Sequence, residues 1–490
     1  MSKRFYITTT LPYVNAPPHI GFALEIVEAD IIARYRALLG EEVFFNTGTD
    51  EHGLKIYRAA EKEGKNHQSY VDEYAAKFDR LKEALNLSYN NFIRTTDPDH
   101  IKAAEEFWRR CDKNGDIYKK FYQIKYCVEC ELEKTESELE NGHCLIHPQA
   151  EIELIEEENY FFKWSNYEKD LLDFYEAHPD FVIPESRFNE IKTFVLNGLR
   201  DFSISRLKEK MPWGIPVPGD EKHVMYVWFD ALVNYISALG WPALSEVEGP
   251  SKFEEFWGTK DEPNAIQVAG KDNLRQQSAM WQAMLMSASL PPSKQIFIHG
   301  FVTSGGEKMS KSRGNVIDPM EFVQKYGTDS VRYYLARHIH PFEDSDMTEV
   351  KFKEAYNAHL ANGLGNLVSR IMKMAADYDL EVELPKPEGV IQGREFGEIF
   401  EALENYEFNK VADKLWAEIG RLDAEIQAEK PFNLIESDPK KARKIIADLV
   451  LKLWYLAISL EPLMPETALK IQDLIKKNKA PETPLFPRLD

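Results

Sequence analysis

The opening fifty residues constrain the fold more than any other stretch of this chain. An apolar segment, "RFYITTT", leads through a proline-containing loop into "IGFALEIVEADIIARYRALLG", where apolar residues recur at helical spacing up to Gly40, a residue suited to end a helix. A second strand-like segment, "EVFFNTGTDEHG", then ends in a polar turn. Strand, helix and strand in this order predict a parallel α/β sheet, which binds its ligands at the carboxyl ends of the strands.

Two changes of pattern further along the chain predict additional domains. Cysteines, short strands and acidic runs begin near "GDIYKKFYQIKYCVEC", and the α/β pattern returns with "HVMYVWFDALVNYI" and "QIFIHGFVTSGG". An inserted domain that splits one nucleotide-binding sheet accounts for both observations most simply. Beyond about Val350 the strand signals stop, and helical periodicity over residues 411–426 and 441–460 predicts a C-terminal helical bundle.

Composition narrows the class of protein. A chain of 490 residues is too long for one ordinary core, and 43% apolar with 29% charged residues is typical of a soluble globular protein. No apolar run approaches the ~18 residues of a membrane span, and "MSKRFYITTT" lacks the apolar centre of a signal peptide, which favours the cytoplasm. A net charge of −21 argues against a protein that coats nucleic acid indiscriminately, although a local basic groove would still bind it.

Three of the four cysteines fall close together and predict a metal site. Cys127 and Cys130 form one C-x-x-C pair, and Cys144 with His147 forms a second half-site after a short spacer. This is the spacing of a tetrahedral Zn²⁺ knuckle with three thiolates and one imidazole. A redox-active pair is the alternative for a single C-x-x-C, but the second half-site disfavours it. Four protein ligands leave no open position, so we expect a structural ion, and we expect the remaining Cys111 to be a buried apolar residue.

Two other segments have the chemistry of phosphate binding. His19 and Gly21 of "PPHIGF" lie where a loop enters a helix, so backbone N–H groups and the positive end of the helix dipole would face an anion there. A histidine that only caps the helix is the alternative. "EKMSKS" places Lys308 and Lys311 in a cationic loop, for which ordinary solvated surface is the alternative. The pairing of the two segments on one sheet favours a polyphosphate ligand, and no Walker A or GxGxxG motif occurs.

These segments resemble the signatures of a known enzyme family. "PHIGF" resembles the HIGH signature of class I aminoacyl-tRNA synthetases, and "KMSKS" is identical to their second signature. The methionyl-tRNA synthetases are the most similar members, on "YITTTLPYVN", "FNTGTDEHG", "NYFFKWS", "GLRDFSISR", "WGIPVP", "YVWFDALVNYI", "VAGKDN" and "GNVIDPMEFVQKYGTDSVRYYLAR". These motifs cover most of residues 5–340 in the order of the family.

The resemblance implies an α/β fold with a defined domain order. We expect a class I synthetase Rossmann-like parallel-sheet catalytic domain, split by a zinc-containing insertion and followed by an all-α helical-bundle anticodon-binding domain. The expected segments are 1–117 for the first half of the catalytic domain, 118–214 for the insertion, 215–320 for the second half with the KMSKS loop, 321–352 for a stem-contact connector and 353–490 for the anticodon-binding domain.

The resemblance also implies the residues of the active site. Catalysis is expected from His19, Gly21, Lys308 and Lys311, and ATP binding from these residues together with Asp272 and Ser310. The residues expected to enclose methionine are Leu11, Tyr13, Trp228, Ala231 and Tyr235, with Asp50 on the ammonium group. Aromatic walls suit a polarizable thioether. Without the resemblance, the aromatic residues of "YVWFDALVNYI" would be interpreted as ordinary core.

The implied reaction joins methionine to tRNA in two steps. ATP and L-methionine would form methionyl-adenylate and pyrophosphate, and the methionyl group would then pass to the 3′ end of tRNA(Met) for translation initiation and elongation. Mg²⁺ would accompany ATP, and one structural Zn²⁺ per chain would fill the knuckle. Asn366, Arg370 and Phe432 are the residues implied to contact the anticodon. The end at "LFPRLD", without the appended dimerisation domain of some relatives, favours a monomer.

Three positions depart from the pattern of the family. Phe22 replaces the second histidine of the first signature, Gln276 and Gln277 replace a usual Phe-His pair, and Phe432 stands where many relatives have tryptophan. An aromatic ring at position 22 cannot donate a hydrogen bond to phosphate. Together these departures predict altered kinetics or loosened selection of the amino acid.

Other enzymes and a non-enzyme remain as alternatives. A synthetase for leucine, isoleucine or valine would normally carry a large editing insertion, because a methylene difference is worth only ~1–3 kcal/mol, and the insertion here is too small for that. A cysteinyl enzyme would hold zinc in its active site with an open coordination position. A catalytically silent RNA- or zinc-binding relative is the alternative of a different class, motivated by Phe22.

Overall fold

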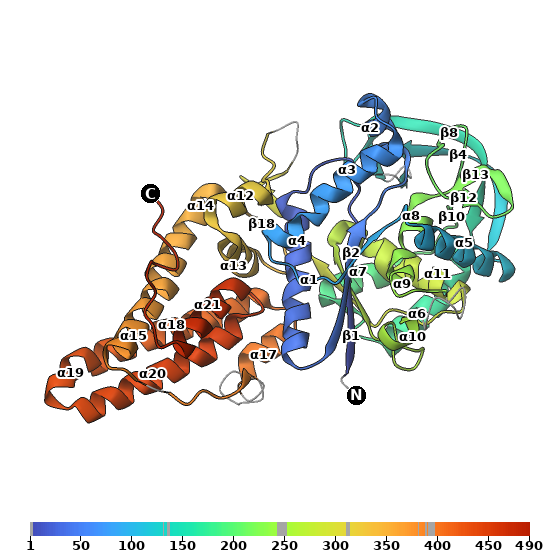
Figure 1. Ribbon diagram of the computed structural model, residues 1–490. Coiled ribbons are helices and arrows are strands. Elements are labelled where there is room, and N and C mark those ends of the chain that lie inside the picture. Colours follow the sequence, from blue (N-terminus) through green and yellow to red (C-terminus); the bar gives the residue numbers. More distant parts are fainter. Residues whose placement is uncertain are drawn as a thin grey trace.

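The computed structural model describes residues 3–130, 132–134, 138–242, 252–309, 314–380, 382–387, 390 and 397–490. Figure 1 shows an α/β part and a helical part, with the long helix α1 (Ile20–Leu38) at the boundary between them. The parallel sheet and the helical C-terminal region that the sequence predicts are both present.

A six-stranded parallel sheet forms the centre of the α/β part. Its order is β3-β2-β1-β14-β15-β9, and every neighbouring pair is parallel. The strands are β1 (Arg4–Thr9), β2 (Glu42–Thr49), β3 (Asn91–Arg94), β14 (Ala265–Gly270), β15 (Gln295–His299) and β9 (Val182–Ile183). The chain runs from β1 outward through β2 to β3, and from β14 outward to β15, while the earlier strand β9 joins at the edge beside β15. The β1/β14 boundary is therefore the topological switch point where open α/β sheets bind ligands.

Helices cover this sheet on both sides, as its apolar strands require. α1 follows β1 directly and ends before Gly40, whose φ of 80° suits the glycine predicted to end it. The other helices of this part are α2 (Leu54–Lys62), α3 (His67–Asp79), α4 (Leu81–Ala84), α5 (Pro98–Lys113), α8 (Val227–Ala231), α9 (Asn234–Ser237), α10 (Phe253–Phe256), η4 (Lys271–Asn273), the π-helical turn η5 (Gln276–Met280) and α11 (Trp281–Ser287).

A long antiparallel hairpin dominates the segment predicted to be an insertion. β4 (Ile117–Cys127) pairs with β8 (Ile152–Phe162) along its whole length. β5 (Leu132–Lys134) and β10 (Phe202–Ser203) complete that sheet, and β6 (Leu139–Glu140) with β7 (His143–Cys144) forms a small hairpin beyond it. The segment also contains η2 (Trp164–Tyr167), α6 (Glu168–Ala177), β9, α7 (Glu185–Leu196) and β11 (Ser205–Leu207). Because β9 joins the central sheet beside β15, the chain returns to the catalytic core within residues 118–214, a boundary that stays a prediction.

Two further small sheets lie outside the central sheet. β11 pairs with β13 (Asp220–Met225), which also pairs with β12 (Pro216–Val217). β16 (Val302–Ser304) pairs with both β17 (Glu307–Lys308) and β18 (Ser345–Asp346). The second of these sheets holds the described start of the KMSKS loop against the segment that precedes the bundle.

The described residues of the C-terminal region form mainly helices. α12 (Pro319–Tyr326), α13 (Thr328–His338) and α14 (Glu349–Ala355) lead into the π-helical η7 (Tyr356–Gly365) and α15 (Asn366–Asp377), followed by α17 (Gly397–Glu404), α18 (Phe408–Glu429), α19 (Pro431–Ser437), α20 (Pro439–Leu460) and α21 (Pro465–Lys476). The two predicted helices are confirmed as α18 and α20. None of the described helices combines the length and apolar character that a membrane span requires.

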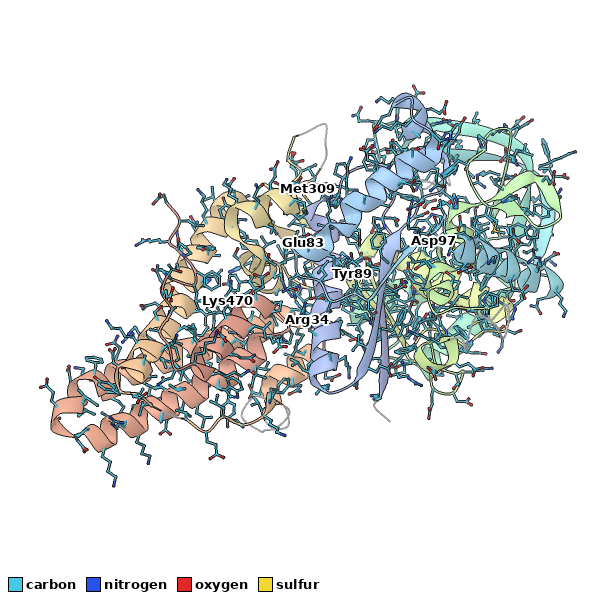
Figure 2. The ribbon with its side chains drawn as sticks, in the orientation of Figure 1. Arg34, Glu83, Tyr89, Asp97, Met309 and Lys470 are labelled. Carbon is cyan, nitrogen blue, oxygen red and sulfur yellow. The ribbon has the colours of Figure 1, made fainter. Side chains whose placement is uncertain are left out.

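A buried ion pair joins α1 to the bundle. Arg332 of α13 is fully buried, and its Nη1 lies 2.8 Å from Oδ2 of Asp30 on α1. The same guanidinium donates from Nε to the carbonyl of Leu463 and from Nη2 to that of Pro462, between α20 and α21. Arg34, labelled in Figure 2, pairs with Asp30 as well. One charged cluster therefore connects the helix that starts at the HIGF turn with the far end of the chain.

Candidate active site and metal centre

His19 begins α1 and has a defined tautomer. Its Nδ1 accepts a hydrogen bond of 3.1 Å from the backbone N–H of Gly21, so the ring proton lies on Nε2. A Cβ on Gly21 would lie 2.9 Å from His19 Cε1, which explains why glycine is needed here. The surrounding protein and then the charge of Lys308 lower the pKa of His19. The site therefore presents a neutral imidazole that donates from Nε2 at a helix N-terminus.

The described start of the KMSKS loop lies close to this turn. Met309 Cε is 3.9 Å from the position that a Cβ on Gly21 would occupy. Figure 2 labels Met309 at the base of the loop, beside the start of the helical region. The structure thus places the described start of the KMSKS segment beside the His19 turn, and phosphate binding by the two segments stays a prediction. Ser310 and Lys311 lie outside the described residues, and their roles stay predictions.

Lys308 supplies positive charge to several groups of the site. Its charge lowers the pKa of His19 and of His147, in each case after burial. Burial raises the pKa of the Asp272 carboxyl, and the positive charge of Lys308 lowers it in part. Since Lys308 itself is exposed, its ammonium is available to an incoming anion. A phosphate chain placed at the His19 turn would lie within its field.

Asp272 follows β14 at the carboxyl edge of the sheet. A Cβ on Gly270 would lie 2.9 Å from Asp272 Oδ1 and 3.5 Å from the ring of His299, so glycine lets these groups approach. Asp272 therefore lies beside the β1/β14 switch point, and its role in binding ATP stays a prediction.

His299, at the end of β15, is a member of the site that sequence reasoning missed. Its Nδ1 donates to the carbonyl of Gly300 over 2.7 Å and its Nε2 to Glu25 over 3.0 Å. Burial alone would lower the pKa of His299, but Glu25 and then Glu28 outweigh it and raise the pKa to about 9. Glu25 also accepts from the backbone N–H and the hydroxyl of Thr10. This imidazolium ties the ends of β1 and β15 to the first turns of α1.

The residues predicted to bind methionine come together from three distant segments. The backbones of Tyr13 and Asp50 form a parallel bridge, with Asp50 N–H donating to the carbonyl of Pro12 over 3.0 Å. The Tyr13 and Trp228 rings meet edge to face with centroids 6.4 Å apart. Ala231 is buried, whereas Leu11 is half-buried. The structure thus groups the carboxylate of Asp50 with apolar and aromatic walls.

Tyr235, which is also predicted to enclose methionine, is buried and has Gln277 as its hydrogen-bond partner. Gln277 Nε2 donates to the Tyr235 hydroxyl over 2.8 Å, while Gln277 Oε1 accepts from Gln267 over 3.2 Å. Burial raises the pKa of Tyr235, so its hydroxyl keeps its proton. The neighbouring Gln276 differs, because its buried Oε1 has no hydrogen-bond partner among the described residues. Both glutamines belong to the π-helical turn η5, a rare geometry that is frequent at functional sites.

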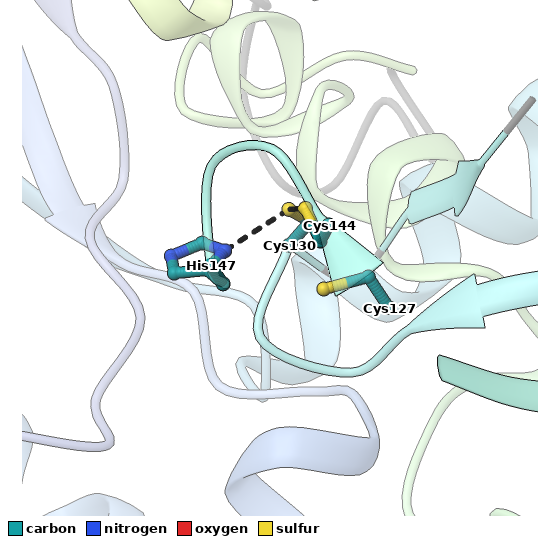
Figure 3. A group of neighbouring side chains, drawn as sticks. All are labelled: Cys127, Cys130, Cys144 and His147. Carbon is teal, nitrogen blue, oxygen red and sulfur yellow. Dashed lines mark hydrogen bonds between the residues drawn. The ribbon is translucent and has the colours of Figure 1, made fainter. Parts of the chain in front are cut away.

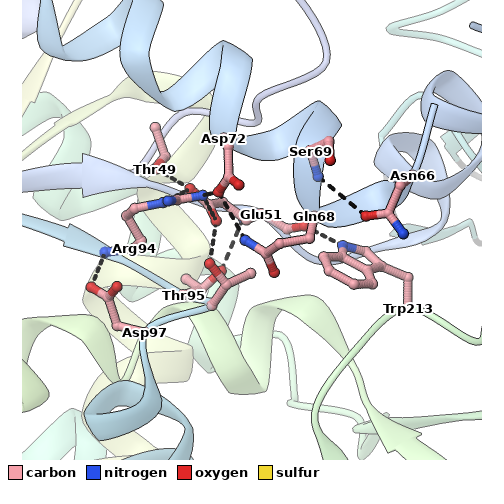
Figure 4. Close-up of polar contacts among 11 residues, drawn as sticks. Thr49, Glu51, Asn66, Gln68, Ser69, Asp72, Arg94, Thr95, Asp97 and Trp213 are labelled. Atoms are coloured by element: carbon pink, nitrogen blue, oxygen red, sulfur yellow. Dashed lines mark hydrogen bonds and ion pairs between the residues drawn. The ribbon is translucent and has the colours of Figure 1, made fainter.

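Glu51, the neighbour of Asp50 in the sequence, is held by the polar contacts that Figure 4 shows. Arg94 donates to the Glu51 carboxylate from Nε over 2.6 Å and from Nη2 over 2.9 Å. The Glu51 N–H donates to Thr95 Oγ1, and its carbonyl accepts from Trp213 Nε1 over 2.6 Å. Glu51 and Arg94 were missed at the sequence level, because an acidic residue in a polar turn resembles ordinary surface. Their bidentate pair fixes the backbone immediately after Asp50.

Phe22 contributes to packing rather than to the phosphate turn. Its ring is half-buried and meets Phe78 of α3 edge to face at 5.3 Å. The backbone N–H of Phe22 donates to the His19 carbonyl over 3.0 Å. The residue that replaces the second histidine of the signature therefore belongs to the contact between α1 and α3.

The predicted metal ligands form one compact cluster, shown in Figure 3. The ligand atoms of Cys127, Cys130, Cys144 and His147 all lie within 4.8 Å of one another. Cys130 Sγ is 3.5 Å from Cys144 Sγ and 3.1 Å from His147 Nδ1. A tetrahedral Zn²⁺ with Zn–S bonds near ~2.3 Å separates its sulfurs by about 3.8 Å, so the cluster fits such an ion. Burial and the other cysteines raise the pKa of the Cys130 thiol to about 12, an effect that a bound cation opposes.

Ion pairs hold the knuckle against the catalytic part. Lys55 of α2 pairs with Glu129 over 2.8 Å, and Arg275 pairs with Glu138 over 3.3 Å. Glu129 lies between the cysteines of the first half-site, so the metal cluster and α2 are directly linked. The remaining Cys111 is buried on α5, as expected, and burial raises its pKa to about 12.

The residues predicted to contact an anticodon lie on the helical bundle. Asn366 is exposed at the start of α15, and Arg370 lies one turn later on the same face. Arg370 forms an ion pair with Asp423 of α18. Phe432 of α19 is 44% exposed, which is unusual for a large aromatic ring. Their contact with RNA stays a prediction.

Comparison with known proteins supplies independent information. The family model described as "tRNA synthetases class I (M)" matches residues 5–136 and 129–372. The methionine–tRNA ligase of Thermotoga maritima is 41% identical over 478 residues, which cover 95% of this chain and 74% of the relative. That of Thermosynechococcus vestitus is 47% identical over 396 residues, 81% of this chain and 73% of the relative. A solved structure of Mycobacterium tuberculosis methionyl-tRNA synthetase in complex with methionyl-adenylate has a TM-score of 0.88 at 35% identity, covering 99% of this chain and all of that one.

Proposed function

Because this chain belongs to the methionine–tRNA ligase family of class I tRNA synthetases, we propose that it activates L-methionine with ATP and transfers the methionyl group to the 3′ end of tRNA(Met). The observation that carries this proposal is the meeting of the His19 turn and the KMSKS segment at the same edge of the sheet as the Tyr13, Asp50 and Trp228 group.

The first step needs no general base. The carboxylate of methionine is ionised at pH 7 and attacks the α-phosphorus of ATP, and the bond to pyrophosphate breaks. Catalysis is then positioning and charge stabilisation. In this proposal His19 donates from Nε2 to a phosphate oxygen, while Lys308 and Lys311 neutralise the departing pyrophosphate. Mg²⁺ bound with ATP would supply further positive charge to the phosphate chain.

Methionine would be held at both of its ends. The Asp50 carboxylate is buried and can accept from the α-ammonium group. The rings of Tyr13 and Trp228 would enclose the side chain, with Tyr235 at its far end. Asp272 would bind ATP at the switch point. The support for these assignments is the grouping of the residues in space.

The second step uses the terminal nucleotide of tRNA. Its ribose hydroxyl attacks the acyl carbon of methionyl-adenylate, and AMP leaves with the electron pair of the broken bond. Asn366, Arg370 and Phe432 would contact the anticodon through hydrogen bonds and stacking. Because Arg370 pairs with Asp423, base binding there exchanges one acceptor for another.

The remaining assignments concern the metal ion, the oligomeric state and the cellular location of the protein. Cys127, Cys130, Cys144 and His147 would hold one Zn²⁺, whose chemistry is to cross-link the knuckle and not to activate substrate. We expect the protein to act as a monomer in the cytoplasm.

Methionine-dependent exchange of pyrophosphate into ATP tests the proposed function. With Mg²⁺ present, purified protein should catalyse exchange with methionine, and much more weakly with leucine or homocysteine. A protein that binds tRNA but shows no exchange would instead be the silent relative. Exchange that is faster with leucine would contradict the assigned substrate.

A further inference from the structure

The residues proposed to bind methionine must be held at fixed positions relative to one another. They come from residues 11–14, 50–52 and 228–235, three segments that are far apart in the sequence. The backbone bridge between Tyr13 and Asp50 connects the first two. A side-chain cluster around Asp230 connects the second to the third.

Asp230 accepts hydrogen bonds from two histidines. It belongs to α8 and is fully buried. Its Oδ2 lies 2.7 Å from Nδ1 of His52, in the loop that carries Asp50, and its Oδ1 lies 2.8 Å from Nε2 of His100 on α5. A carboxylate only accepts, so each imidazole donates. The other nitrogen of His100 lies 2.9 Å from the hydroxyl of Ser237 on α9.

The electrostatics keep Asp230 ionised. Burial alone would raise the pKa of this carboxyl, but His52 and His100 outweigh it and hold the pKa below its ordinary value. Charge-assisted hydrogen bonds in a water-free environment are strong and directional. The three side chains therefore act as a rigid clamp.

We propose that Asp230 is a positioning residue for methionine, an inference that rests on the proposed function. Asp230 stands beside Ala231 and two positions after Trp228, while His52 stands two positions after Asp50. The bond between His52 and Asp230 therefore sets the distance from the ammonium-binding carboxylate to the walls around the side chain.

A second contact orients the His52 ring. It packs against Trp213 with ring centroids 5.7 Å apart, and Trp213 donates to the carbonyl of Glu51. In the described part of the chain, no hydrogen bond or ion pair joins this cluster to His19 or Lys308. Loosening the clamp is therefore expected to affect methionine much more than ATP.

Steady-state exchange kinetics on the full-length protein test this role. Asp230→Asn keeps the shape of the side chain but replaces one acceptor by an amide that cannot accept from its histidine. We expect the KM for methionine to rise about tenfold or more, because small misplacements of a binding group are costly, while the KM for ATP stays within about twofold.

Asp116→Asn is the matched control. Asp116 is another buried carboxylate of the catalytic part, and it accepts from Ser287 over 2.8 Å and from Asn114 over 2.6 Å. Its replacement should lower the Tm as Asp230→Asn does and leave the KM for methionine unchanged. A general loss of stability would affect both variants alike, so only a positioning role separates them.

A pair of substitutions at His52 tests the same bond from its other side. The amide N–H of His52→Asn can take the place of Nδ1, whereas His52→Ala has no donor. We expect His52→Ala to raise the KM for methionine strongly. His52→Asn should have a KM for methionine close to that of the wild type. The two His52 variants test whether the hydrogen bond between His52 and Asp230 positions the methionine-binding residues, even if Asp230→Asn does not fold.

The outcomes distinguish a failure of the positioning role of Asp230 from a failure of the proposed function. Equal rises in the KM for methionine and for ATP in Asp230→Asn, or equal KM values for methionine in both His52 variants, would overturn the positioning role. A wild-type protein without methionine-dependent exchange would overturn the proposed function itself.

Discussion

Gln277 occupies a position where the resemblance predicts histidine, yet it makes a specific contact. Because it donates to the Tyr235 hydroxyl, that bond does not use the hydroxyl's own proton, which can then be donated to a ligand at the proposed methionine site. Gln277→Leu should raise the KM for methionine about tenfold and reduce discrimination against leucine, since a buried hydroxyl loses its donor. Gln276→Leu is the control and should change exchange kinetics little, as the Gln276 Oε1 lacks a partner among the described residues. Equal effects of the two variants would refute the role of Gln277.

Glu28 of α1 gives a pH-dependent prediction. Burial raises its pKa to about 8, although the charge of His299 opposes that effect and the charge of Glu25 adds to it, whereas the ordinary pKa of a glutamate is 4.5. The folded protein therefore holds a proton that the unfolded chain releases, so this contribution to stability is full below about pH 4.5 and is lost as pH rises through 8. Glu28→Gln should increase the free energy of unfolding little at pH 5 and by roughly 3–5 kcal/mol more at pH 9.

Denaturant unfolding at both pH values measures that difference. The exposed Glu83, labelled in Figure 2, supplies the control substitution Glu83→Gln, which should show no such growth with pH. A gain at Glu28→Gln that is the same at pH 5 and pH 9 would contradict the account.

Local motifs were predictable at the residue scale, and partners were not. The compact cluster of Cys127, Cys130, Cys144 and His147 was predictable because its C-x-x-C and C-x-x-H spacings are local in the sequence, and the helix that begins at His19 was predictable for the same reason. The partner of His52 is 178 residues away and that of His299 is 274 residues away, so only the tertiary fold reveals them. Phe22 is the reverse case: the resemblance presents it as a missing donor, while the structure shows a packing residue against Phe78.

At the scale of elements, we expect the segment around Cys127, Cys130, Cys144 and His147 to depend on a bound ion. Its strands β6 and β7 are two residues each, too short to be stable alone. Metal analysis of purified protein should find about one Zn²⁺ per chain, and Cys127→Ser should abolish it, because structural zinc binding supplies folding energy directly. Cys111→Ser is the control and should keep the zinc. Wild-type protein without zinc would contradict the four-ligand site.

Helices were easier to predict from the sequence than the pairing of strands. The helix after the HIGF turn and the helices α18 and α20 follow from periodicity. The pairing of β9 with β15 does not, because two residues carry no periodic signal. The π-helical turns η5 and η7 were also not predictable, since their extra residue per turn is set by packing and not by propensity.

For the whole molecule, the buried pair of Arg332 and Asp30 predicts coupled stability between its two parts. Arg332→Met should lower the free energy of unfolding by about 3 kcal/mol, because Asp30 loses its main buried partner. In the double variant with Asp30→Asn the loss should be smaller than the sum of the single losses by at least about 1 kcal/mol. Additive losses, measured by denaturant unfolding, would mean that the pair does not act as a unit.

The proposed function requires both parts of the molecule to act on one RNA. The α/β part would hold the activation site, and Asn366, Arg370 and Phe432 of the bundle would contact the anticodon. We therefore expect activity on tRNA to depend on the anticodon although the chemistry occurs elsewhere. The sequence predicted both domains, while the α1–α13–α21 junction that sets their arrangement became visible only in the structure.

Aminoacylation of tRNA(Met) transcripts with radiolabelled methionine tests this most directly. The full chain with ATP and Mg²⁺ should charge a transcript that carries the CAU anticodon. A transcript with a changed anticodon should be charged at least about tenfold more slowly, because each lost base contact is worth ~1–3 kcal/mol. No charging of the CAU transcript, or equal charging of both, would contradict the account.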